Sequence, residues 1–274
     1  MSIDRAAPAV TGTERIAAAF GRAREEGRAA LMPYMMGGFP DQVTANAVAG
    51  AYADAGADLI ELGVPFSDPL ADGPVIHAAA TEALARGATL GSVLETCEAV
   101  ADRVPVVAMC YANMVLAHGV SQFTERLSGA GAAGAIVPDL PLEEAAEARE
   151  ELNRAGLALV PLVTPTTPPE RRARICASAR GFVYVVSVTG VTGERDEVQP
   201  ELGELVSAVR SEAAVPVAVG FGVGTPRTAA AVGKIADGVI VGSRLVRAVD
   251  DAGDPASAAG AVSAFLREAR AAIG

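Results

Sequence analysis

The sequence predicts an α/β fold: a single (β/α)8 TIM barrel preceded by an extra N-terminal helix. Eight short apolar runs alternate with helical segments along the 274 residues. The runs are continuously apolar, as parallel strands covered on both faces require. No linker or shift in composition interrupts the alternation, which favours one closed barrel. The alternative is an open doubly wound sheet, but no GxGxxG motif follows the first run.

The elements follow from apolar spacing and from capping residues. Ile16 and Phe20 share one face of the leading helix, Asp41 is placed to cap the second, and Gly56 ends it. We predict residues 1–12 to be a flexible tail and 13–274 the barrel domain. The predicted strands are 31–36, 58–63, 104–111, 134–138, 157–163, 181–187, 215–219 and 238–241. The predicted helices are 13–26, 41–54, 75–86, 90–102, 120–128, 142–154, one opening at 168–170, 202–212, 226–232 and 255–272.

Composition excludes several classes of function. A net charge of −11 argues against a nucleic-acid or anionic-membrane surface, which needs fields of Lys and Arg. The amino terminus lacks an apolar signal-peptide core, and no uncharged apolar run reaches a membrane-spanning length. The three cysteines have no CxxC spacing and fit reduced structural thiols. These features predict a cytoplasmic protein.

Two scarce residue types limit the chemistry further. Lys234 is the only lysine, and it precedes the last predicted strand, at the end of the barrel opposite the working face. Imine catalysis and pyridoxal phosphate attachment both need a placed lysine. His77 and His118 are the only histidines, too few for a usual zinc or iron site. We therefore expect no cofactor and no metal in this chain.

One loop carries two acids at a strand end. Glu61 lies at the end of the second strand, and Asp72 closes the loop that follows. Pro65 and Pro69 each fix φ and remove a donor, so the loop is stiff. Two positioned carboxylates suit general acid/base work. In the alternative interpretation Asp68 and Asp72 only cap the next helix, and Glu61 forms a core salt bridge.

Glycine-rich turns follow the last two strands. Gly220-Phe221-Gly222 and Gly242-Ser243 occupy the positions where such barrels bind phosphate through backbone amides. Each could be merely a tight turn, but the pair favours a phosphate site. Residues 188–200, which include Gly193, form an unusually long connection. That segment is either a lid that excludes water or a surface insertion.

Several large side chains fall near the predicted strand ends, in a protein with few aromatic residues. They could line an apolar pocket for a flat ring, although ordinary core packing would also explain each one. These residues are Tyr34, Met109, Tyr111, Tyr184 and Phe221.

Taken together, the motifs resemble those of the α subunit of tryptophan synthase. They occur in family order over about residues 31–247. They are Glu61-Leu-Gly-Val-Pro-Phe-Ser-Asp-Pro-Leu-Ala-Asp72-Gly-Pro, Tyr111-Ala-Asn-Met, Val137-Pro-Asp-Leu-Pro, Ser187-Val-Thr-Gly-Val-Thr-Gly193, Gly220-Phe-Gly and Gly242-Ser.

The resemblance implies retro-aldol cleavage of indole-3-glycerol phosphate. It makes Glu61 the main acid/base and Asp72 the acceptor of the indole N–H. It implies that Thr192 bonds Asp72 when the lid closes, and that Tyr184 orients Glu61. The phosphate would be held by Gly193, Gly220, Phe221, Gly222, Gly242 and Ser243.

The resemblance also implies a partner. This is a β subunit that carries pyridoxal phosphate, in an α2β2 complex, and receives indole through a tunnel. It would contact the loop 65–68 and elements after the third strand. A standalone indole-glycerol-phosphate lyase, another phosphosugar isomerase or epimerase barrel, and a catalytically idle scaffold for a β subunit remain as alternatives.

Overall fold

The computed structural model describes residues 10–186, 199–220 and 222–274. Within these residues the strands are β1 Ala30–Met36, β2 Ile60–Gly63, β3 Val106–Met109, β4 Gly134–Ile136, β5 Ala158–Val160, β6 Leu162–Val163, β7 Val183–Val186, β8 Val217–Gly220 and β9 Gly238–Val241. The helices are α1 Gly12–Glu25, α2 Gln42–Asp54, α3 Pro74–Ala85, α4 Leu90–Glu98, α5 Ala112–His118, α6 Val120–Gly129, α7 Ala146–Arg154, α8 Pro169–Ser178, α9 Pro200–Glu212, α10 Pro226–Gly233, α11 Ser243–Asp250 and α12 Pro255–Ile273.

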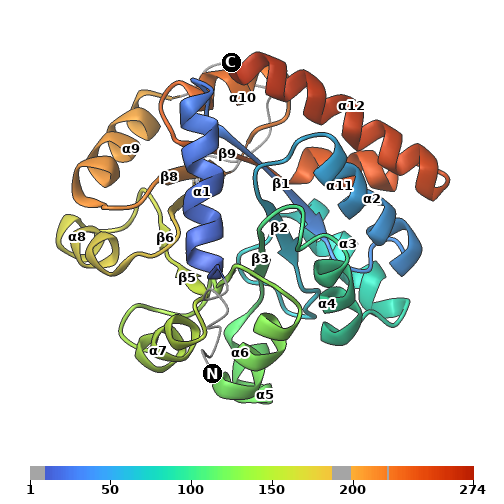
Figure 1. The fold of residues 1–274 in the computed structure, drawn as a ribbon, viewed down its shortest axis with the longest axis horizontal. Coiled ribbons are helices and arrows are strands. Elements are labelled where there is room, and N and C mark those ends of the chain that lie inside the picture. Colours follow the sequence, from blue (N-terminus) through green and yellow to red (C-terminus); the bar gives the residue numbers. More distant parts are fainter. Residues whose placement is uncertain (1–9, 187–198, 221) are drawn as a thin grey trace, which may run out of the picture.

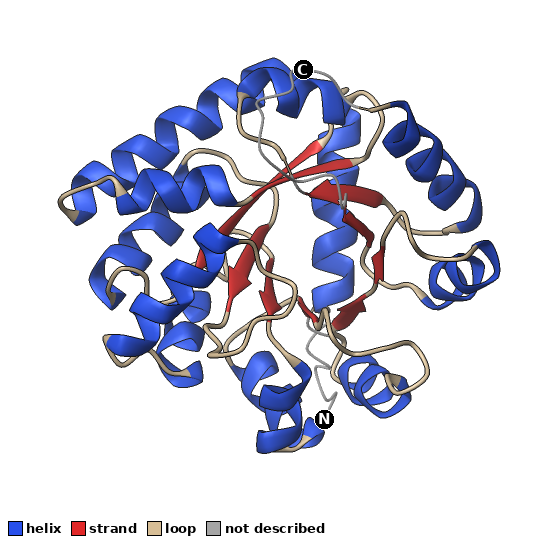
Figure 2. Ribbon diagram, turned by 180° about the vertical axis from the view of Figure 1, so that it is seen from behind, coloured by secondary structure: helices blue, strands red, loops and turns tan. Residues whose placement is uncertain are grey.

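The strands form one parallel barrel surrounded by helices, as predicted (Figures 1 and 2). The ladder runs β5-β4-β3-β2-β1-β9-β8-β7-β6. Its two ends, β5 and β6, are halves of the single strand predicted over 157–163, which Pro161 divides. Proline has no N–H to donate to a ladder. Its carbonyl still accepts from the Tyr184 N–H at 3.0 Å, so the backbone closes the ring.

Helix α1 crosses the amino end of the barrel (Figure 1). Its Thr11 cap and Glu14 form a capping box, and the helix begins at Gly12, one residue before the predicted start. Ile16 and Phe20 pack inside the barrel with Met32 and Phe182. A Cβ on Gly12 would lie 2.6 Å from the Ala133 Cα, so the helix approaches β4 closely. The extra N-terminal helix is thus confirmed; of the predicted tail, residues 1–9 lie outside the described residues.

Some predicted boundaries were wrong. Helix α7 begins at Ala146 instead of residue 142, because 142–144 form a turn closed by the Glu144 N–H on the Pro141 carbonyl. Helix α4 ends at Glu98 instead of residue 102, and the chain continues in short turns to Val104. Strand β3 ends at Met109, before Tyr111. Helices α5 and α11 were not predicted.

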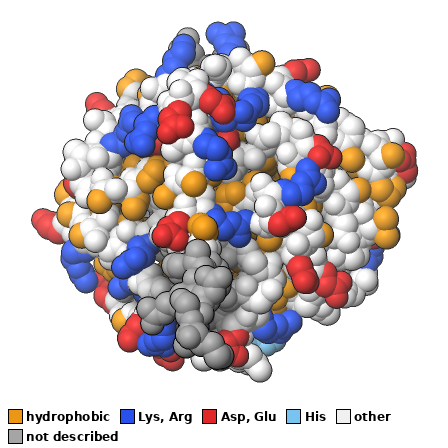
Figure 3. Space-filling model, in the orientation of Figure 1, with side chains coloured by type: hydrophobic (Ala, Val, Ile, Leu, Met, Phe, Trp, Pro, Cys, Tyr) orange, Lys and Arg blue, Asp and Glu red, His pale blue; other side chains and the backbone are white. Residues whose placement is uncertain are grey.

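The described surface has no dominant field of charge on the side that α1 crosses. Basic and acidic side chains are interspersed there with small apolar patches (Figure 3). No described helix is both long and apolar enough to cross a membrane. Lys234 follows α10 and precedes β9, at the amino end of the barrel, as predicted.

Candidate active site

Glu61 is a buried carboxyl at the carboxyl end of the barrel. It lies in β2, is 1% exposed, and pairs in register with Tyr34 of β1. Its Oε2 atom has no hydrogen-bond partner within the described residues. Burial, reinforced by the nearby Asp72 charge, raises the pKa of Glu61 to about 8. The alternative of a core salt bridge is not supported, because no described cation pairs with this carboxyl.

Asp72 lies above Glu61, in the loop that joins β2 to α3. The Tyr111 hydroxyl accepts from the Ala71 N–H at 3.1 Å, and the Phe66 ring stacks on Tyr111 with centroids 5.2 Å apart. These contacts fix the loop against the start of α5. Burial raises the pKa of Asp72, opposed by a hydrogen bond from Tyr111 and by the nearby His77. Asp72 does not cap α3, whose N-cap is Gly73 with no side-chain bond.

Two tyrosines flank Glu61 inside the barrel. Tyr34 comes from β1 and Tyr184 from β7. Burial, followed by the charges of Glu61 and Asp72, raises the pKa of both tyrosines well above the ordinary range. Both hydroxyls therefore stay protonated and can donate hydrogen bonds throughout the working pH range. Four other predicted site residues lie within electrostatic reach of the Tyr34 hydroxyl: Glu61, Asp72, Tyr111 and Tyr184.

Two glycines make room for these tyrosines. A Cβ on Gly63 would lie 2.8 Å from Cζ of Tyr34, and closer still to its hydroxyl. A Cβ on Gly220 would lie 2.7 Å from Cε2 of Tyr184, and again closer to the hydroxyl. Gly220 was predicted as a phosphate residue, and the structure adds this steric role. The importance of Gly63 was not predicted.

The glycine turns meet the same mouth. Gly222 has φ +77°, a left-handed conformation that favours glycine. Gly242 is the N-cap of α11, and Ser243 is the first residue of that helix. No side chain caps this N-terminus in the described structure, so its amides are available to an anion. A Cβ on Gly242 would lie 3.8 Å from the Tyr34 Cβ, which places this turn beside the acid pair.

Three predicted site residues, Thr192, Gly193 and Phe221, lie outside the described residues, as does most of the predicted lid segment. Among the described residues, no three His, Cys, Asp or Glu side chains are grouped to hold a metal ion.

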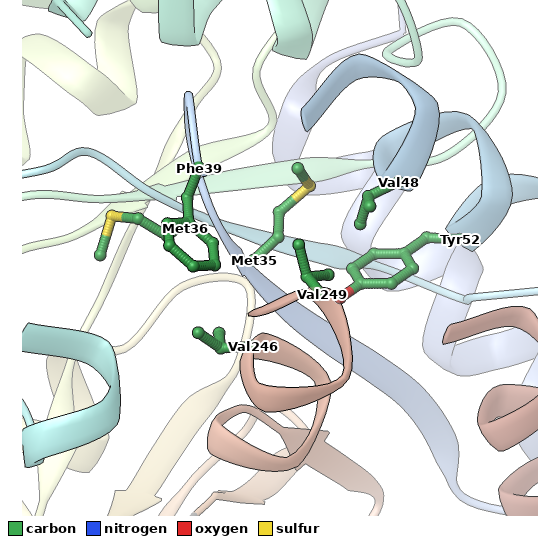
Figure 4. Close-up of a pocket in the computed structure, with 7 residues that line it drawn as sticks. All are labelled: Met35, Met36, Phe39, Val48, Tyr52, Val246 and Val249. Carbon is green, nitrogen blue, oxygen red and sulfur yellow. The ribbon is translucent and has the colours of Figure 1, made fainter. Parts of the chain in front are cut away.

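A small apolar cavity of about 10 Å³ lies behind the site, between the end of β1, α2 and α11 (Figure 4). It has room for about one water molecule, but no array of polar partners to hold one. We assign it to packing and not to substrate. Its lining residues are Met35, Met36, Phe39, Val48, Tyr52, Val246 and Val249.

Comparison with known proteins decides the family. The model of the family described as "Tryptophan synthase alpha chain" matches residues 20–273. The chain belongs to this family. The tryptophan synthase alpha chain of Synechococcus sp. (strain CC9902) is 49% identical over 260 residues, covering 93% of this chain and 96% of the relative. The tryptophan synthase alpha chain of Geobacter sulfurreducens is 46% identical over 235 residues, covering 85% of this chain and 89% of the relative.

Solved structures agree. A Mycobacterium tuberculosis tryptophan synthase structure superposes with a TM-score of 0.88 at 38% identity, covering 94% of this chain and 98% of the other. The structure of the tryptophan synthase alpha chain of Legionella pneumophila subsp. pneumophila superposes with a TM-score of 0.85 at 33% identity. It covers 94% of this chain and 97% of the other. As a member of this family, the protein is a lyase of tryptophan biosynthesis.

Proposed function

We propose that this chain cleaves indole-3-glycerol phosphate to indole and glyceraldehyde 3-phosphate, using two carboxylates and no cofactor of its own. The observation that carries the proposal is the buried Glu61 carboxyl, whose Oε2 has no hydrogen-bond partner among the described residues. A side chain buried at this cost, at the mouth of a barrel, is typical of a group that transfers protons. Its pKa of about 8 leaves it protonated near neutral pH.

The first step is protonation of the ring. Glu61 gives its proton to the indole carbon that bears the glycerol phosphate side chain. That carbon becomes tetrahedral, and the ring becomes a protonated indolenine with its positive charge centred on nitrogen. The Asp72 carboxylate accepts the N–H hydrogen bond and stabilises the growing charge. The Tyr111 hydrogen bond and His77 oppose the rise in the Asp72 pKa, and so help to keep this carboxyl ionised.

The second step breaks the carbon–carbon bond. Glu61, now a carboxylate, removes the proton of the hydroxyl on the adjacent side-chain carbon. That carbon becomes the aldehyde of glyceraldehyde 3-phosphate, and the bonding electrons return to the ring to give indole. Glu61 recovers its proton, so no acid or base is consumed. The ring is the electron sink that an aldol cleavage otherwise takes from an imine or a metal.

The backbone at the mouth supplies phosphate binding. The described residues for this role are Gly220, Gly222, Gly242 and Ser243, and the uncapped N-terminus of α11 supports it. Gly193 and Phe221 complete the proposed set, and Thr192 is proposed to bond Asp72 when the lid closes. Tyr184 is proposed to orient Glu61, which fits the electrostatic coupling between the two side chains.

The proposed partner is a β subunit, in an α2β2 complex, with pyridoxal phosphate bound only in β. Two leucines near the mouth support a partner surface: Leu70 is 87% and Leu116 is 66% exposed. Leu70 adjoins Ala71, which is bonded to the Tyr111 hydroxyl, and Leu116 lies on the helix that Tyr111 caps. Apolar groups exposed on one rim are suited to burial against another chain.

The deciding experiment is indole formation from indole-3-glycerol phosphate by the purified chain, with and without a β subunit. We expect indole and glyceraldehyde 3-phosphate in equal amounts, and faster turnover with the partner. Glyceraldehyde phosphate without indole would indicate a different phosphosugar reaction. An inactive chain that still stimulates the β subunit would indicate a scaffold, and full activity without response to any partner would indicate a standalone lyase.

Asp72→Asn tests the second carboxylate. The amide cannot carry the negative charge that stabilises the indolenium, so kcat should fall about 10²-fold. Binding of a phosphate-bearing product should change little, because the glycine turns are intact. A variant with normal kcat and weakened phosphate binding would show that Asp72 has been given the wrong role.

A further inference from the structure

The Tyr34 ring occupies a site that only glycine at residue 63 leaves open. In the parallel pair β1/β2, Tyr34 stands beside Glu61, and Met36 stands beside Gly63. Side chains alternate along a strand, so Tyr34, Glu61 and Gly63 share the interior face of the barrel. The Tyr34 ring therefore leans from its own register toward the mouth, with its hydroxyl above Gly63.

The same stagger recurs in β7/β8. Tyr184 stands beside Ala218, and Gly220, which makes room for the Tyr184 ring, lies two residues further along β8. The two tyrosines reach the acid from different strands. Strand β1 is hydrogen-bonded to β2, which carries Glu61, whereas β7 is not a neighbour of β2 in the ladder. Tyr34 is thus the tyrosine on the strand next to the acid.

The charges around Glu61 determine which interaction the Tyr34 hydroxyl can make with it. The titratable groups that face Glu61 among the described residues are Asp72, Tyr34 and Tyr184, with Tyr111 and His77 beside Asp72. None of them is a cation placed to pair with Glu61. A buried carboxylate without any partner would be held in its neutral form, so its second role, as a base, requires a donor that appears when it ionises.

We propose that Tyr34 is a positioning residue, whose hydroxyl, seated over Gly63, donates a hydrogen bond to the Glu61 carboxylate once that group has given up its proton. This inference rests on the proposed function of the site. The bond eases ionisation of Glu61 and aims the carboxylate for the return of the proton. It also explains why residue 63 is glycine, since any Cβ there would displace the ring.

Tyr34→Phe tests the proposal by removing one oxygen atom. A hydrogen bond to the ionised form lowers a pKa, so its loss raises the pKa of Glu61 further. Because the reaction starts from protonated Glu61, activity falls as pH rises through this pKa. We expect that falling limb of kcat/KM to move up by about one pH unit, and kcat to drop about tenfold. A limb that stays in place, or moves down, overturns the proposal.

Tyr52→Phe is the matched control. Tyr52 is a fully buried tyrosine on α2, and its hydroxyl donates to the Tyr34 backbone carbonyl at 3.0 Å. Removing it takes the same atom from the other side of β1. Thermal unfolding should report lost stability, while the falling limb stays where it is in the wild type. A shift of the limb equal to that of Tyr34→Phe would make the effect one of general packing, and so refute the assignment.

Gly63→Ala tests the proposed hydrogen bond between Tyr34 and Glu61 by a change on β2 instead of β1. The added methyl group displaces the Tyr34 ring, so we expect a larger loss of kcat, with the limb moved up as in Tyr34→Phe. Infrared difference spectra of the Glu61 carboxyl, identified by Glu61→Gln, give the same pKa independently of turnover. Failure of the wild type to form indole would refute the proposed function. Wild-type activity with unchanged Tyr34→Phe spectra would refute this inference alone.

Discussion

Two buried carboxylates, three positions apart, behave in opposite ways. Asp58, just before β2, is 7% exposed and fully engaged. Arg28 donates to its two oxygens at 2.5 and 2.8 Å, and the Leu31 N–H donates at 2.8 Å. Glu61, within β2, is 1% exposed and has an oxygen without a partner in the described structure.

The difference separates a structural acid from a functional one. Asp58 lies at the amino end of the barrel, where its ion pair with the 4% exposed Arg28 joins β1 and β2. Glu61 lies at the carboxyl end, where burial without compensation raises its pKa to about 8. Burial is therefore a poor guide to the role of either acid. The hydrogen-bond partners distinguish the two.

The largest expected effect comes from Glu61→Gln. The amide keeps the shape of the side chain but cannot shuttle a proton, so indole formation should fall about 10³-fold or more. Stability should be retained at neutral pH, because the variant buries no charge. Turnover and thermal unfolding, measured on the same preparation, check both statements. Activity close to that of the wild type would contradict the distinction drawn between the two acids.

Asp58→Asn should give the converse result. It leaves the buried Arg28 with only the exposed Glu26 as a charge partner, which costs about 3 kcal/mol of unfolding free energy. The chemistry at the other end of the barrel is untouched, so kcat per folded molecule should change less than about twofold. Urea unfolding and active-site titration measure the two quantities. A large loss of kcat in fully folded protein would show that the ends of the barrel are coupled.

The last expected effect is a pH dependence of stability, which leaves the wild-type fold and its chemistry at neutral pH unaltered. The pKa of Glu61 is about 8 in the folded protein, against 4.5 as its reference value. The folded state therefore binds a proton that the unfolded state loses between these pH values. The contribution of Glu61 to stability is full below about pH 4.5 and is lost as pH rises through about 8. Glu61→Gln should flatten this slope in urea titrations from pH 5 to 9; an unchanged slope would contradict it.

Most of the barrel could be predicted because its strands are unbroken apolar runs, which parallel strands require. The short helices α5 and α11 escaped prediction for a physical reason. Their N-caps are Tyr111 and Gly242, neither of which makes a side-chain capping bond. The Ser, Thr, Asp or Asn signal that marks a helix start is therefore absent. The division of one strand at Pro161 follows from proline chemistry, but only the pairing shows that it closes the ring.

The site was predicted as far as a local motif could carry it. Glu61 and Asp72 lie in one segment, so their spacing was visible in the sequence. The position of the Tyr34 hydroxyl over Gly63 was not predicted, because it depends on the register between two strands and on the tilt of a ring. The hydrogen bond from the Ala71 N–H to the Tyr111 hydroxyl likewise arises only when separate loops meet.

Helix α1, which crosses the amino end of the barrel, limits where substrate can enter and products can leave. Ile16 and Phe20 of α1 pack inside that end of the barrel with Met32 and Phe182, so the amino end is closed by side chains. In the proposed function, the substrate and both products therefore enter and leave at the carboxyl end, where Glu61 and the N-terminus of α11 lie. A partner bound over the carboxyl end would set how long substrate and products stay in the barrel. It would do so without contacting Glu61 or Asp72.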